Sequence, residues 1–270
     1  MTAQRITSLF NSFKTIDVAF NSSVSRALGL NPKEIYLKCL GQQFRCVVYS
    51  SSMTGAKIVM SVSKDNLTLF RKANNAVSLR YCFTDEEKAV PITFFVPAKI
   101  MGFTPYGNNP ELNFITLSFT SQPPDTLVAA LGMLIEANVN AKRRAEERIL
   151  MNQENIRKLG IKPKSSVLSI TGIPRACILR DISFSGAMVI ISGIGKFLLE
   201  KDATLRLEFD DIKTFITLKG KVQRFEEVQG RKELSALGIL FNQEELPIEY
   251  KMKVNDFLSR KGKPSPVSSE

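Results

Sequence analysis

The sequence contains no histidine, and this absence bears on two classes of function. Histidine is the commonest general base and a frequent zinc ligand. The four cysteines (Cys39, Cys46, Cys82 and Cys177) form no CxxC pair, so a zinc site has no ligand set. No nucleophile elbow, Walker loop or dinucleotide fingerprint occurs either. We therefore predict that the chain is not an enzyme and holds neither a metal nor a cofactor.

Long apolar segments are also missing. The most apolar stretch, residues 127–137, is interrupted by Gly132 and Glu136 and is too short to span a bilayer. The first twenty residues carry charged side chains and lack the apolar core of a secretory signal. The cysteines lie in apolar, strand-like runs, as expected for free thiols in a reducing cytosol. We expect a cytoplasmic protein that does not insert into membranes.

Positive charge is what the sequence has in excess. The formal net charge is +11, and residues 141–164 alone hold eight basic and three acidic side chains. Such a local excess favours an anionic partner, which could be a nucleotide, a nucleic acid or an acidic protein surface. A solvated basic helix would have the same composition, so charge alone does not choose among these partners.

Two stretches of the chain, residues 35–119 and 165–241, consist of short runs rich in Val, Ile, Phe and Tyr, separated by turn residues. Each stretch contains about six such runs, which predicts two six-stranded antiparallel β-barrels and suggests a structural duplication. One or two short helices are expected within residues 1–29, and a closing helix over residues 247–258. The predicted fold class is therefore mainly β with flanking helices.

A helical pattern separates the two predicted barrels. It starts at Pro123-Pro124-Asp125, continues into the basic stretch, and ends by Gly160. We expect the following division of the chain: an N-terminal domain over residues 1–122, a helical basic connector over 123–164, a C-terminal domain over 165–260, and a disordered tail over 261–270.

Two short motifs accompany the second barrel. The first is Arg144-Ala-Glu-Glu-Arg148, and the second is Asp181-Ile-Ser-Phe-Ser-Gly186. Chance alone produces an RxxxR spacing about once in a chain of this composition, but a DxSxxG only about 0.04 times. In this order the pair resembles the RxxxR and DxSxxG signature of PilZ domains, which are bacterial receptors for cyclic di-GMP. The alternatives are arginines paired with carboxylates on a solvated helix and a simple hairpin turn.

The resemblance implies a role for each motif residue. Arg144 and Arg148 would contact guanine and phosphate, because a guanidinium can bridge guanine O6 and N7 or fork onto a phosphate. Asp181 would accept hydrogen bonds from the N1–H and N2–H₂ edge of guanine. Ser183 would offer a small hydroxyl, and together with Gly186 it would shape the floor of the site.

Arg143 and Arg180 lie beside the motifs and are additional candidates, although a surface role fits each equally well. Arg148 and Asp181 are 33 positions apart, which is longer than expected for the family. The sequence therefore leaves open how far the arginines reach onto the barrel.

The resemblance covers residues 140–260, and residues 30–120 resemble the degenerate PilZ-like domain of two-domain members, flagellar brake proteins included. It implies a cyclic di-GMP receptor that changes its interdomain arrangement on binding and regulates motility, envelope or virulence functions through an unknown protein partner. The alternative is a basic β-barrel protein that binds nucleic acid, although no aromatic residues interleave residues 142–164. Ligand stoichiometry and oligomeric state are not fixed by the sequence.

Overall fold

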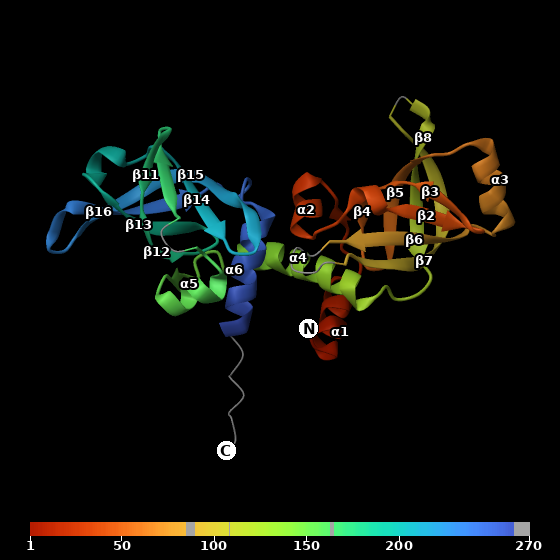
Figure 1. Cartoon of the computed structure of the whole chain (residues 1–270), viewed down its shortest axis with the longest axis horizontal. Helices are drawn as coiled ribbons and strands as arrows, with labels where there is room; N and C mark the ends of the chain where they lie inside the picture. Colours follow the sequence, from red (N-terminus) through yellow and green to blue (C-terminus); the bar gives the residue numbers. More distant parts are fainter. Residues whose placement is uncertain (85–89, 108, 163–164, 262–270) are drawn as a thin grey trace, which may run out of the picture. The chain divides into compact units, whose positions relative to one another are not determined.

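The structure, a computed structural model, describes residues 1–84, 90–107, 109–162 and 165–261. It divides the chain into two compact units, Met1–Ile135 and Glu136–Glu270, each with its own β-sheet (Figure 1). Within the part of the chain that the structure describes, no helix is both long and apolar enough to cross a membrane. The tail predicted over residues 261–270 lies outside the described residues except for its first position.

The first unit consists of an antiparallel sheet and short helices. Its strands are β1 (Val18–Ala19), β2 (Tyr36–Cys39), β3 (Gln42–Arg45), β4 (Val47–Ser51), β5 (Gly55–Ser61), β6 (Ala76–Phe83), β7 (Ile92–Tyr106) and β8 (Asn109–Phe119). Its helices are α1 (Ala3–Phe13), α2 (Ser22–Ala27), the 3-10 helix η1 (Pro32–Glu34) and α3 (Lys64–Lys72). The one or two short helices expected within residues 1–29 are observed as α1 and α2.

The second unit repeats this plan. Its strands are β9 (Ile149–Leu150), β10 (Val167–Ile170), β11 (Ile173–Ala176), β12 (Ile178–Ile182), β13 (Gly186–Ser192), β14 (Asp202–Phe209), β15 (Ile212–Val228) and β16 (Arg231–Phe241). Its helices are α5 (Gln153–Leu159), the 3-10 helix η2 (Gly195–Leu198) and α6 (Ile248–Lys261). Helix α4 (Asp125–Arg143) runs across the division between the units. The predicted closing helix is confirmed as α6.

The two sheets have the same topology. Their strand orders are β1-β4-β5-β8-β7-β6-β2-β3 and β11-β10-β14-β15-β16-β13-β12-β9. When eight is added to each strand number of the first order and the list is read in reverse, it becomes the second order. The bulges coincide as well: the register shifts between Val48 and Ser50 in the first unit and between Leu179 and Asp181 in the second. The expected structural duplication is therefore confirmed.

The prediction of two closed six-stranded barrels is wrong in strand number and in closure. Each unit has one eight-stranded sheet that begins and ends at an edge strand. In the first unit the β-rich run at residues 43–49 divides at Cys46 into β3, which pairs with β2, and β4, which pairs with β1 and β5. In the second unit the run at residues 176–182 divides in the same way at Cys177. The sequence shows one extended run because strand propensity is local, whereas the pairing partner is not.

The single helical connector predicted over residues 123–164 is not confirmed. After α4 the chain makes a turn, adds β9 to the sheet, forms α5, and places Ile161 in an isolated bridge with Phe209. Ile149 and Leu159 are buried in the apolar core of the second unit. Because these side chains complete that core, the segment after α4 is part of the second unit.

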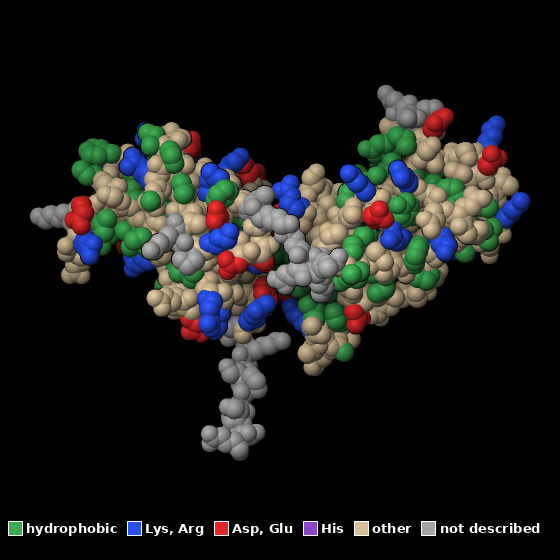
Figure 2. Space-filling view, in the orientation of Figure 1, with side chains coloured by type: hydrophobic (Ala, Val, Ile, Leu, Met, Phe, Trp, Pro, Cys, Tyr) green, Lys and Arg blue, Asp and Glu red, His purple; other side chains and the backbone are tan. Residues whose placement is uncertain are grey.

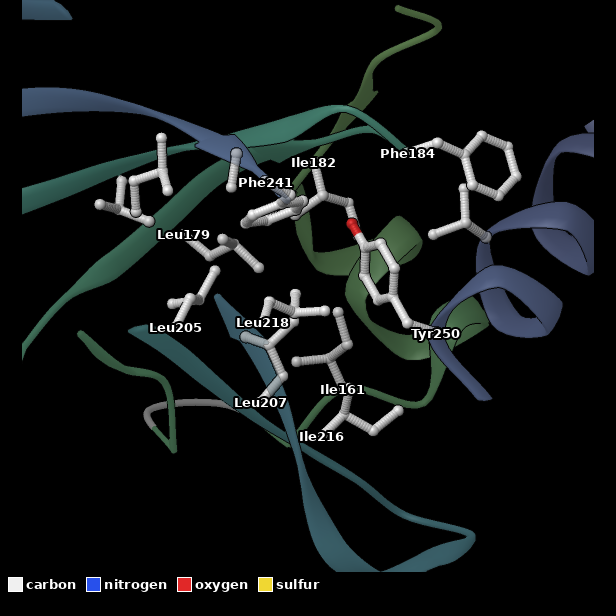
Figure 3. Close-up of a cluster of buried hydrophobic side chains, with 14 of the residues drawn as sticks. Ile161, Leu179, Ile182, Phe184, Leu205, Leu207, Ile216, Leu218, Phe241 and Tyr250 are labelled. Atoms are coloured by element: carbon white, nitrogen blue, oxygen red, sulfur yellow. The ribbon is translucent and has the colours of Figure 1, made fainter. Parts of the chain in front are cut away.

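The core of the second unit follows from the alternation of its strands. In β14, Ala203, Leu205, Leu207 and Phe209 are buried, while the residues between them are more exposed. Figure 3 shows this cluster, with Tyr250 entering it from α6. Helix α6 therefore covers the inner face of the sheet, and its contacts reach the turn between β12 and β13.

All four cysteines are free thiols. Cys39, Cys46 and Cys82 are buried and Cys177 is half-buried. Burial raises the pKa of Cys46 to about 12 and that of Cys177 to about 11, so both remain protonated at neutral pH. These findings confirm the expectation of unpaired thiols.

Candidate ligand-binding site

Strand β9 brings the two motifs together. It pairs antiparallel with β12, so that Ile149 lies opposite Ile182 and Leu150 opposite Asp181. Arg148, directly before β9, consequently reaches Asp181, with 2.5 Å between Nη1 and Oδ1. The long interval between the motifs does not keep them apart, because it is occupied by β9, α5 and the hairpin of β10 and β11.

The Arg148–Asp181 pair combines a buried carboxylate with a more accessible guanidinium. The Asp181 side chain is 9% exposed and that of Arg148 is 38% exposed. A buried carboxylate is costly without a partner, so Arg148 contributes to the stability of this corner of the fold. A guanidinium has five N–H donors, and the contact with Asp181 uses Nη1. The group can therefore hold Asp181 and a second acceptor at once.

Arg144 is paired within its own motif. Its Nε and Nη2 donate to the two carboxylate oxygens of Glu147, at 2.6 and 2.9 Å. The backbone N–H of Glu147 donates to the carbonyl of Arg144, so the motif is a turn that follows α4. Both side chains are partly exposed, and such pairs contribute little net stability. An anionic ligand can therefore compete with Glu147 for Arg144 at low cost.

Ser183 organises the turn between β12 and β13. Its side chain is fully buried, and its hydroxyl accepts a hydrogen bond from the backbone N–H of Gly186 at 3.1 Å. Its backbone N–H donates to the carbonyl of Gly186 at 2.8 Å. The next turn residue, Ser185, donates its N–H to the carbonyl of Ala145 in the arginine motif. Of the two roles expected for Ser183, this geometry supports the shaping of the turn.

Gly186 is required by the close approach of two strands. It is the first residue of β13, opposite Leu240 of β16. A Cβ atom at this position would lie 2.2 Å from the carbonyl oxygen of Ile239. Side chains other than hydrogen therefore force the strands apart at the edge of the site.

Two residues outside the motifs, the buried Tyr250 and the exposed Gln243, donate side-chain hydrogen bonds to the turn. The hydroxyl of Tyr250 on α6 donates to the carbonyl of Ser183 at 2.7 Å, and Nε2 of Gln243 donates to the carbonyl of Phe184 at 3.0 Å. Burial raises the pKa of Tyr250 well above its ordinary value, so the hydroxyl remains a donor. Tyr250 lies in the closing helix that the sequence predicts over residues 247–258, but a tyrosine in a helix carries no sign of its hydrogen-bond partner.

The two additional candidates, Arg143 and Arg180, lie on different elements. Arg143 is exposed at the end of α4. Arg180 occupies the bulge directly before Asp181, is about half exposed, and has Glu226 as a neighbour at 3.7 Å. The structure thus brings Arg148, Asp181 and the turn into contact and places Arg180 beside them.

The corresponding positions of the first unit carry other side chains. Aligned by strand register, Phe13 and Asp17 stand in place of the two motif arginines, and Ser50 stands in place of the motif aspartate. Ser52 and Gly55 are retained, with the same N–H to carbonyl hydrogen bond across the turn at 2.9 Å. The first unit therefore keeps the turn and lacks the charged groups.

Two domain families match the chain, the PilZN3 domain over residues 4–138 and the PilZ domain over residues 142–259. A curated protein of Treponema denticola, described as a cyclic di-GMP binding protein, is 38% identical over 264 residues, covering 97% of this chain and 84% of that protein. The chain belongs to the PilZ family. It is a two-domain member, with a PilZN3 domain followed by a PilZ domain that carries both motifs.

Solved structures are similar to this chain at lower identity. PlzA of Borreliella burgdorferi in complex with c-di-GMP is 23% identical, with a TM-score of 0.43, covering 94% of this chain and 98% of that one. The K. pneumonia MrkH–c-di-GMP complex is 12% identical, with a TM-score of 0.32, covering 97% of each chain. PilZ-domain proteins bind ligands rather than catalyse reactions, which confirms that this member is not an enzyme.

Proposed function

We propose that the chain is a receptor for cyclic di-GMP, with its site on the PilZ domain. The observation that carries this proposal is the ion pair between Arg148 and the buried Asp181, which β9 assembles at the edge of the sheet. The description of the T. denticola relative as a cyclic di-GMP binding protein supports the same ligand.

Each motif residue has a distinct task in this proposal. Arg144 and Arg148 bind phosphate or the O6 and N7 acceptors of guanine. Asp181 accepts from the N1–H and N2–H₂ edge of a guanine while Arg148 fixes its orientation. Ser183 and Gly186 shape the turn that presents the carboxylate. Among the residues that the structure describes, no group of three or more His, Cys, Asp and Glu side chains could hold a metal ion.

Calorimetric titration of the purified chain tests the ligand. We expect cyclic di-GMP to bind with micromolar or tighter affinity, equivalent to about 8 kcal/mol or more. Cyclic di-AMP and GTP should bind at least about 100-fold more weakly, because adenine lacks the donor edge that Asp181 recognises and GTP offers a single guanine. Absence of binding, or equal binding of all three nucleotides, would contradict the proposal.

We further propose that binding changes the arrangement of the two domains. Helix α4 passes from the first unit into the second and ends at Arg143, directly before the arginine motif. A ligand that draws Arg144 away from Glu147 acts on the end of this helix. It can shift the arrangement only by its different affinities for the two states.

Small-angle scattering with and without saturating cyclic di-GMP measures this change. We expect the distance distribution of the chain to shift on addition of ligand and to stay constant on addition of GTP. Identical curves at a ligand concentration that calorimetry shows to be saturating would refute the rearrangement and leave the binding intact.

The output that we propose is a protein partner in motility, envelope or virulence control in the cytoplasm. Binding to nucleic acid is the second candidate, supported by the net charge of +11. On the face drawn in Figure 2, however, basic side chains are spread among acidic and hydrophobic ones rather than gathered in a stripe. A steep fall in nucleic-acid affinity with salt would identify that activity. The domain limits at residues 122, 164 and 260 stay predictions.

A further inference from the structure

The face of the second sheet that carries Asp181 also carries an arginine three strands away. By register, Asp181 lies opposite Met188, Met188 opposite Gly238, and Gly238 opposite Arg224. Residues directly opposite each other on neighbouring strands project to the same face of a sheet. With strands about 4.8 Å apart, the row from Asp181 to Arg224 spans roughly 14 Å.

The side chain of Arg224 lies across this row toward Asp181. A Cβ atom on Gly238 would be 2.6 Å from Cγ and 2.9 Å from Nε of Arg224. The arginine stem therefore passes over β16, in the direction of β13 and β12. Any side chain at position 238 would displace it, so Gly238 provides the space that Arg224 occupies.

One carboxylate lies between two arginines on this face. Glu226 is 4.0 Å from Nε of Arg224 and 3.7 Å from Nη1 of Arg180. The three side chains are 49–55% exposed. Long ion pairs between exposed groups are weak, so a phosphate that accepts two hydrogen bonds can take either guanidinium from Glu226.

The first unit shows that the fold does not impose this arrangement. There, Gly102 stands in place of Arg224, and Thr116 stands in place of Gly238. Phe114 stands in place of Ala236, and its ring contacts Tyr49 with 5.0 Å between centroids. In the first unit, which lacks the aspartate, aromatic rings cover this face. In the second unit, which has the aspartate, the corresponding positions of β16 are Gly238 and Ala236, and arginines lie on the same face.

We infer that Arg224 is a further ligand-contacting residue, that Gly238 makes room for it, and that Glu226 holds Arg224 and Arg180 until an anionic ligand binds. This inference rests on the proposed function. Cyclic di-GMP has two phosphates and two guanines, and each presents an acceptor pair that a guanidinium can bridge. Arg148 and Asp181 hold one part of the ligand, and Arg224 contacts another part across the sheet.

Titration of four variants with cyclic di-GMP tests the inference. We expect Arg224→Gln to weaken binding about tenfold, as the loss of one forked contact implies. Gly238→Ala should weaken binding about three- to tenfold through displacement of Arg224. Glu226→Gln should strengthen it about threefold, because a competing carboxylate is removed. Arg206→Gln is the matched control: Arg206 lies on β14 over the ring of Phe215, and its loss removes the same charge.

The outcomes separate the inference from the proposed function. If the unsubstituted chain does not bind cyclic di-GMP, the proposed function fails. If it binds, and Arg224→Gln has the same affinity as Arg206→Gln, the inference alone is overturned. Weaker binding by Glu226→Gln would overturn the role of Glu226 as competitor. Thermal unfolding of each variant shows whether the PilZ domain remains folded at the temperature of titration.

Discussion

Alanine at both Arg144 and Arg148 is expected to weaken the binding of cyclic di-GMP about 1000-fold. Each guanidinium contact with guanine or phosphate is worth about 1–3 kcal/mol, and the two together about 4 kcal/mol. The loss at Arg148 has a second component, because Asp181 would remain as a buried carboxylate without its partner. Calorimetry or fluorescence anisotropy with a labelled ligand measures the change in affinity.

Two matched variants make this result specific. Lysine at both positions keeps the charge and lacks the forked geometry, and we expect it to restore no more than a tenth of the lost affinity. Alanine at Arg26 and Arg71, two exposed arginines of the first unit, removes the same charge and should leave binding within twofold. Comparable affinities of the two alanine pairs would show that the motif arginines are not the site.

Alanine at Gly186 is expected to destabilise the PilZ domain by about 3 kcal/mol or more and to abolish binding. The new methyl group would meet the carbonyl oxygen of Ile239 at 2.2 Å, and a backbone atom in a paired strand cannot move aside cheaply. Strand β13 would shift away from β16, and the turn that carries Ser183 would shift with it. Urea unfolding followed by circular dichroism measures the free energy.

Gly102 supplies the control for this substitution. It lies in β7 of the first unit, and a Cβ atom there would have nothing within 4 Å. Alanine at Gly102 should change the free energy of unfolding by less than about 1 kcal/mol. Equal effects of the two substitutions would mean that the strand approach at Gly186 does not limit its side chain.

The features that the sequence predicted correctly depend on local patterns. The duplication, the closing helix and the position of the DxSxxG turn between two strands all follow from alternation and turn chemistry within a few residues. Helix α3 was missed although its signals are local too. Ser63 accepts a hydrogen bond from the N–H of Asn66 as N-cap, and Phe70 is buried. Helix α3 connects β5 to β6, in a segment that the sequence analysis did not assign to any helix.

The features that could not be predicted depend on pairing between distant segments. Strand β9 has two residues and no pattern of its own, yet it places Arg148 on Asp181. The chain divides at Cys46 into β3 and β4 and at Cys177 into β11 and β12, because the two strands on either side of each cysteine pair with different partners. The neighbours of the motifs, Glu226 and Tyr250, are likewise visible only once the strands and α6 are assembled.

The duplication also bears on how the chain responds to the concentration of its ligand. The first unit keeps the turn of the second but has Phe13, Asp17 and Ser50 where the proposed site has two arginines and an aspartate. Cooperative, sigmoidal binding requires at least two interacting sites. For a single chain that binds one ligand molecule at the proposed site, occupancy rises gradually with ligand concentration. The first unit therefore repeats the fold without the charged groups of the proposed site, and a steeper response would require interaction between two or more chains or ligands.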